Sequence, residues 1–140
     1  MKFDDKYFRD FAFTKDQVKK NFDNALKDIR IARQDTIPDV KFTYSYDALI
    51  KGGIALISRY NKKIKSAPGH HAKIIEAIAG ILKDGAIEAV GNAMRSKRNI
   101  DFYVGGIEIT EKESHEYLDY VDDILRKIEK VLNQSVNKNP

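Results

Sequence analysis

Apolar residues recur at intervals of three or four along most of the chain, which is the spacing of side chains on one face of an α-helix. One such stripe is Val18-Phe22-Ala25-Ile29-Ala32. The full pattern predicts five helices, over residues 14–34, 43–63, 70–83, 86–103 and 110–132. Breaks between them are expected near Pro38, Pro68, Gly85 and Gly105, because proline and glycine interrupt helices.

Capping boxes mark two of the predicted helix starts. Thr14 stands three residues before Gln17, and Thr110 stands three residues before Glu113. In this pattern the hydroxyl and the later side chain satisfy backbone N–H groups that the first turn leaves unpaired.

A glycine pair lies at the centre of the predicted 43–63 helix. Each interior glycine costs about 1 kcal/mol relative to alanine. Gly52 and Gly53 together therefore indicate that another backbone approaches closely, and we expect a partner subunit to contribute to this contact.

The fold class follows from the helices and the short connections between them. No segment alternates as a strand would, and no internal repeat is present. The sequence predicts an all-α, antiparallel up-and-down bundle of four to five helices. Its 140 residues form one domain, 1–140, with an N-terminal arm over 1–13 and a frayed tail over 133–140.

Composition narrows the chemistry that the chain can perform. Cysteine is absent, so disulfides, thiolate metal sites and a cysteine nucleophile are excluded. No run of about 18 apolar residues is present, and residues 1–13 are too charged for a signal peptide. We expect a cytoplasmic protein with no membrane segment. The net charge of +4 permits contact with phosphate without requiring it.

Other charged and titratable residues give weaker signals. The histidines do not have metal-ligand spacing, so neither a metal nor a cofactor is expected. His70 and His71 are expected to be exposed in the first turn of a helix. The cluster Arg59, Lys62, Lys63 and Lys65 is expected to be solvated.

The 86–103 helix carries the most informative pattern. Ile87, Val90 and Met94 define its packing face, and the next members of the same stripe are Arg98 and Asp101. Arginine and aspartate are seldom buried unless they are paired or functional. Either the helix end emerges into water with an Arg98–Asp101 ion pair, or a polar pocket forms there. The candidate residues for binding phosphate and ribose are Arg95, Lys97, Arg98, Asn99, Asp101 and Tyr103.

Residues 94–103, read Met-Arg-Ser-Lys-Arg-Asn-Ile-Asp-Phe-Tyr, resemble the motif region of the HEPN superfamily of helical, nucleotide-associated domains. There an arginine, usually followed by a polar residue, precedes a histidine with four to six residues between the two. The resemblance also includes the 44–57 helix with its small residues, Pro68-Gly69-His70-His71 and the Gly105-Gly106 break, and so covers about 44–132. It implies a helical bundle that dimerises, and in many members a metal-independent ribonuclease toxin partnered by a nucleotidyltransferase.

The chain departs from this motif at one position. Tyr103 stands where the resemblance places the histidine, so Arg98 and Tyr103 are the candidate catalytic pair. Tyrosine, with an ordinary pKa near 10, is a poor general base at pH 7. The departure favours binding over catalysis, although Tyr103 could instead accept an adenylyl group. One further alternative is that His70 or His71 reaches the Arg98 cleft and replaces the missing base.

The sequence thus predicts a HEPN-like, homodimeric, nucleotide- or RNA-associated protein. It would be the toxin-type component of a toxin–antitoxin or defence system, with phosphate bound through Arg98. The alternative is a non-enzymatic helical module whose Arg98 face docks a partner protein.

Overall fold

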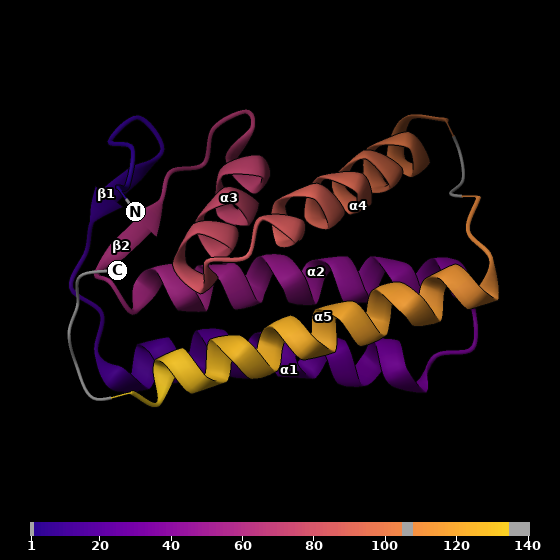
Figure 1. Cartoon of the computed structure of the whole chain (residues 1–140), viewed down its shortest axis with the longest axis horizontal. Helices are drawn as coiled ribbons and strands as arrows, with labels where there is room; N and C mark the ends of the chain where they lie inside the picture. The colour runs from indigo at the N-terminus through magenta and orange to yellow at the C-terminus, as the bar shows by residue number, and fades with distance from the viewer. Residues whose placement is uncertain (1, 105–107, 135–140) are drawn as a thin grey trace.

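Five helices and one two-stranded sheet make up the described part of the chain (Figure 1). The computed structural model describes residues 2–104 and 108–134, except for the side chains of 100–104. The elements are β1 (Phe8–Asp10), α1 (Lys15–Gln34), α2 (Pro38–Ser58), β2 (Lys62–Ile64), α3 (His70–Leu82), α4 (Gly85–Val104) and α5 (Glu111–Leu132). The expected all-α helical bundle is confirmed.

Helix α2 lies at the centre of the bundle. It contacts α1, α3, α4 and α5. Helices α1, α2 and α5 run side by side along the molecule, while α3 and α4 cover another side of α2 (Figure 1). Across residues 2–104 and 108–134, no helix has an apolar stretch long enough to cross a membrane.

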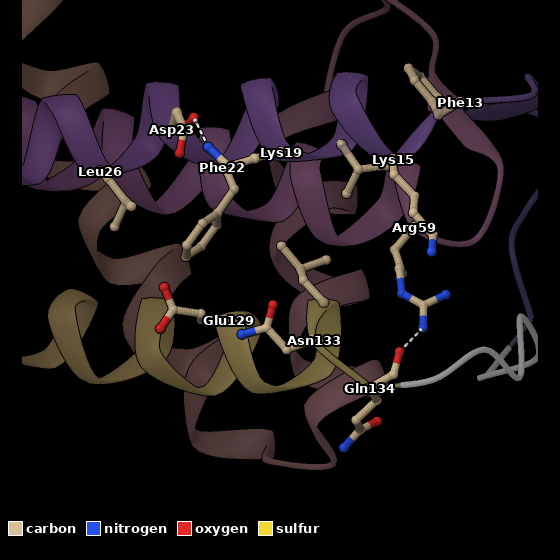
Figure 2. Close-up of a pocket in the computed structure, with 12 residues that line it drawn as sticks. Phe13, Lys15, Lys19, Phe22, Asp23, Leu26, Arg59, Glu129, Asn133 and Gln134 are labelled. Carbon is tan, nitrogen blue, oxygen red and sulfur yellow. Dashed lines mark hydrogen bonds and ion pairs between the residues drawn. The ribbon is translucent and has the colours of Figure 1, made fainter.

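The two predicted capping boxes form as expected. The Thr14 hydroxyl accepts a hydrogen bond from the Gln17 backbone N–H at 3.1 Å, and the Thr110 hydroxyl accepts one from that of Glu113 at 3.0 Å. They set the starts of α1 and α5. Where α1 begins and α5 ends, the two helices line a pocket of about 580 Å³ (Figure 2).

The boundaries of α2 differ from the predicted 43–63. The helix spans Pro38–Ser58, so Pro38 opens α2 instead of only ending α1. Proline is favourable at the first helical position because its missing N–H would have no partner there. At the other end the chain leaves the helix through Asn61, which has a positive φ of 56°, and enters β2.

The small sheet was not predicted. Strand β1 pairs antiparallel with β2, with Phe8 opposite Ile64 and Asp10 opposite Lys62. An ion pair between Lys62 and Asp10 joins the two strands further. The expected 1–13 arm is therefore tied to the bundle by backbone pairing. Three-residue strands are too short to show an alternating pattern in the sequence.

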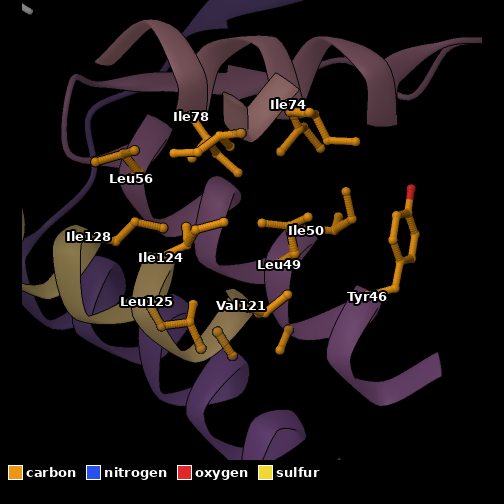
Figure 3. Packing of buried hydrophobic residues seen from close by; sticks show 14 of the residues in the cluster. Tyr46, Leu49, Ile50, Leu56, Ile74, Ile78, Val121, Ile124, Leu125 and Ile128 are labelled. Carbon is orange, nitrogen blue, oxygen red and sulfur yellow. The ribbon is translucent and has the colours of Figure 1, made fainter. Parts of the chain in front are cut away.

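The core gathers around α2, with side chains from α3 on one side and from α5 on another (Figure 3). Gly52 and Gly53 allow this packing. A Cβ on Gly52 would lie 2.5 Å from Leu125 Cδ2, and one on Gly53 would lie 2.4 Å from Ile74 Cγ2. The close approach inferred from the glycines is therefore made by α5 and α3 of the same chain. The expectation that a partner subunit contributes to it is wrong.

Replacing Gly53 tests this packing. Gly53→Ala should lower the free energy of unfolding by about 1–2 kcal/mol, because overpacking outweighs the gain in helix propensity. Gly85→Ala is the matched control, since a Cβ at Gly85 meets nothing within 4 Å. Urea unfolding followed by circular dichroism measures both. A Gly53→Ala variant as stable as wild type would contradict the packing described.

Candidate functional site

Helix α4 directs its charged half toward the start of α3 and the middle of α2. Ile87 and Met94 are buried and Val90 is partly buried, as the apolar stripe predicts. Gly91 allows close contact with α3, because a Cβ there would lie 2.6 Å from Ile75 Cγ2. The stripe then continues into Arg98, whose side chain is only 36% exposed.

Arg98 lies against α2 instead of extending into solvent. Its guanidinium carbon is 5.5 Å from the centre of the Tyr46 ring, a cation–π contact. Its Nε is 3.7 Å from Asp47 Oδ1, which is an ion pair but too long for a hydrogen bond. This Nε is buried and has no hydrogen-bond partner among the described residues. The side chain is thus oriented by two contacts from α2.

Tyr46 connects α2 to α3. It is fully buried, and its hydroxyl oxygen is hydrogen-bonded to His71 Nδ1 at 2.9 Å. Burial raises the pKa of Tyr46 to about 12. Burial lowers the pKa of His71 to about 4, and His70, Arg98 and Arg95 act in the same direction. Both groups are therefore neutral at pH 7 and share one hydrogen bond.

His70 has a defined tautomer when neutral. Its Nδ1 is 2.8 Å from the backbone oxygen of Ala67. A carbonyl can only accept, so Nδ1 carries the proton and Nε2 is left with a lone pair. The His70 and His71 rings pack edge to face at 4.5 Å, and both are partly buried. The expectation that they are exposed first-turn residues is wrong, because α2 and α4 cover this end of α3.

The start of α3, the turn before it and the second half of α4 line an open cleft of about 440 Å³, here named the α3–α4 cleft. Its described lining residues are Ser66, Ala67, Pro68, Gly69, His70, His71, Arg95 and Asn99. Arg95 and Asn99 are four residues apart on α4, so they project from the same side of the helix. The structure thus brings both histidines to the same cleft as two of the predicted binding residues.

The remaining predicted residues lie around this cleft or outside the described part. Arg98 lies next to it on Tyr46 without lining it. Lys97 is directed toward α5, where its Nζ is 3.7 Å from Glu113 Oε2. The side chains of Asp101 and Tyr103 and the Gly105–Gly106 break lie outside the described residues. Periodicity therefore identified Arg95, Arg98 and Asn99. It gave no sign of the two histidines, which the sequence offered only as an alternative and which do line this cleft.

The charges around the cleft favour an anion. Arg95 supplies a full positive charge, and the N-terminus of α3 adds a partial one. No side-chain hydrogen bond caps that N-terminus, where Gly69 occupies the cap position. None of the described lining residues is acidic. Within the described ranges, no group of three or more histidines and carboxylates is placed to hold a metal ion.

The lowered pKa of His71 predicts a pH-dependent stability. Between pH 6.5 and 4 the unfolded chain binds a proton that the folded chain does not, so this contribution to stability is lost as the pH falls. His71→Phe removes this pH-dependent contribution to stability. The stability difference between wild type and variant should shrink by about 1 kcal/mol on going from pH 7 to 4.5, after allowance for solvent screening of a partly exposed ring.

Urea unfolding at a series of pH values measures the difference. His115→Gln is the control, because it removes an exposed histidine on α5 without touching the cleft. An NMR titration of His71 with a midpoint near 6.5 would contradict the burial described.

No protein-family model, curated protein or solved structure matches this chain. The resemblance to HEPN domains therefore rests on the residues of the chain itself. Two of the segments that carry it, Pro68-Gly69-His70-His71 and residues 94–103, contribute to the α3–α4 cleft and its surroundings.

Proposed function

We propose that the protein is a HEPN-like, nucleotide- or RNA-associated protein that binds phosphate at the α3–α4 cleft. It acts as the toxin-type component of a toxin–antitoxin or defence system. One observation carries the proposal. His70 and His71 begin α3, Arg95 and Asn99 lie about 25 residues later, and all four line one cleft.

The chemistry of the cleft supports phosphate as the bound group. Arg95 can make charge-assisted hydrogen bonds to phosphate oxygens, and Asn99 can bond to ribose or base. Arg98 provides a second positive charge next to the cleft, held by Tyr46 and Asp47. In this proposal Tyr103 takes the position of the HEPN histidine.

A homodimer is part of the same proposal. HEPN domains pair so that two motifs face one shared cleft. Asn99 is exposed, so the α3–α4 cleft is open to a second copy or to a long ligand such as RNA. A nucleotidyltransferase is the protein partner that the resemblance implies.

Charge removal at the cleft tests phosphate binding. Arg95→Gln and Arg98→Gln should each weaken binding of short RNAs or adenine nucleotides by about 1–3 kcal/mol, the loss of one charge-assisted contact. Lys97→Gln is the matched control from the same helix, because Lys97 is directed to Glu113. Fluorescence anisotropy at two salt concentrations should give a smaller salt dependence for the two arginine variants than for wild type.

The alternative function makes the opposite prediction. If the Arg98 face docks a partner protein and never contacts RNA, all three variants bind nucleotides and RNA as weakly as wild type does. Unchanged binding of RNA and nucleotides by Arg95→Gln and Arg98→Gln would contradict the proposed function.

Metal-independent RNA cleavage is a second candidate function, favoured by the geometry of His70. Its Nε2 has a lone pair in the neutral ring, which can accept a proton. In the step proposed, Nε2 takes the proton of an RNA 2′-hydroxyl while the 2′-oxygen forms a bond to the adjacent phosphorus. The bond from phosphorus to the 5′-oxygen breaks, the 5′-oxygen takes a proton from water, and Nε2 returns its proton to the solvent. The products are a 2′,3′-cyclic phosphate and a 5′-hydroxyl, so no co-reactant is consumed.

His70→Asn tests this step. Asparagine can still donate a hydrogen bond to Ala67 but cannot act as a base, so cleavage should fall by about 10²-fold or more while RNA binding changes little. Tyr103→His should increase cleavage if residue 103 faces the same phosphate. Both are measured with labelled RNA in the presence of EDTA. Wild-type cleavage rates in His70→Asn would exclude His70 as the base.

A further inference from the structure

Arg59 is buried, contrary to the expectation that its cluster is solvated. Only 8% of the residue is exposed, at the end of α2. One of its N–H groups donates to the backbone oxygen of Gln134 at 2.7 Å. Among the described residues, no carboxylate oxygen lies within 4.0 Å of a guanidinium nitrogen of Arg59. A buried charge without a counter-charge is costly, so the site is suited to an anion.

Arg59 lines the pocket between the start of α1 and the end of α5, here named the α1–α5 pocket (Figure 2). The apolar side chains along it are Phe13, Val18, Phe22, Leu26 and Leu132. Its volume of about 580 Å³ is within the range of small-molecule sites. Such a wall suits an apolar tail several carbons long.

Charge is distributed unevenly along this pocket. Arg59 and Lys15 lie at one end, while Leu26, Asp23 and Glu129 lie toward the other (Figure 2). Asp23 is already paired with Lys19 at 3.0 Å. The end with the buried guanidinium is therefore the place for a negative head group, and the apolar wall extends away from it.

We propose that the α1–α5 pocket binds an anionic amphiphile, a single carboxylate on an unbranched apolar tail. The carboxylate pairs with Arg59 and, at the surface, with Lys15. The tail lies along Val18 and Phe22 toward Leu26. This site is separate from the α3–α4 cleft, and the proposal does not depend on the proposed function.

Head-group and tail comparisons test the proposal on the unmodified chain. Isothermal titration calorimetry would use decanoate, decyltrimethylammonium and hexanoate, each below its micelle concentration. Decanoate should bind at least tenfold more tightly than decyltrimethylammonium, which has the same tail and the opposite charge. It should also bind at least tenfold more tightly than hexanoate, because each buried methylene adds to affinity.

Substitutions then locate the site. Arg59→Gln should weaken decanoate binding at least tenfold. Lys15→Gln should weaken it about twofold, and this exposed position carries little risk of unfolding the chain. Lys112→Gln, which removes an exposed charge at the start of α5, should have no effect.

Three results would overturn the proposal. One is equal binding of the anionic and cationic amphiphiles. Another is undiminished decanoate binding by both Arg59→Gln and Lys15→Gln. The third is equal binding of hexanoate and decanoate, because the apolar wall would then contribute nothing to affinity.

Discussion

The packing around α2 is the constraint on which the other elements depend. All four other helices contact α2, so most of its residues are buried. Gly52 admits Leu125 of α5, and Gly53 admits Ile74 of α3. Once these contacts fix α2, Tyr46 is fixed as well, fully buried between the helices. The α3–α4 cleft is thus positioned by the core beneath it.

Much of the fold could be predicted from local signals. The capping boxes at Thr14 and Thr110 gave the starts of α1 and α5, because a cap is a short-range interaction between neighbouring residues. Pro38 was assigned to the wrong helix, since proline can follow one helix and open the next. The β1–β2 pair joins residues more than 50 positions apart and could not be predicted from either strand alone.

The candidate site was predictable only in part. Arg95, Arg98 and Asn99 follow from the periodicity of one helix. The positions of His71 and Arg59 depend on residues distant in the sequence, Tyr46 and Gln134. The residues next to His71 and Arg59 in the sequence predict that both lie at the surface, because the segments that cover them are distant in the chain. Burial by a distant element has no signature in the sequence around the buried residue.

We propose that the start of α3 and the second half of α4 form one anion-binding cleft. The most direct test is an ¹H–¹⁵N NMR titration of the intact chain with an adenine nucleotide. The amide signals of His70, His71, Arg95 and Asn99 should shift together with one affinity, while the signal of Lys112 stays unchanged. Shifts confined to other helices, or to α4 without the start of α3, would contradict it.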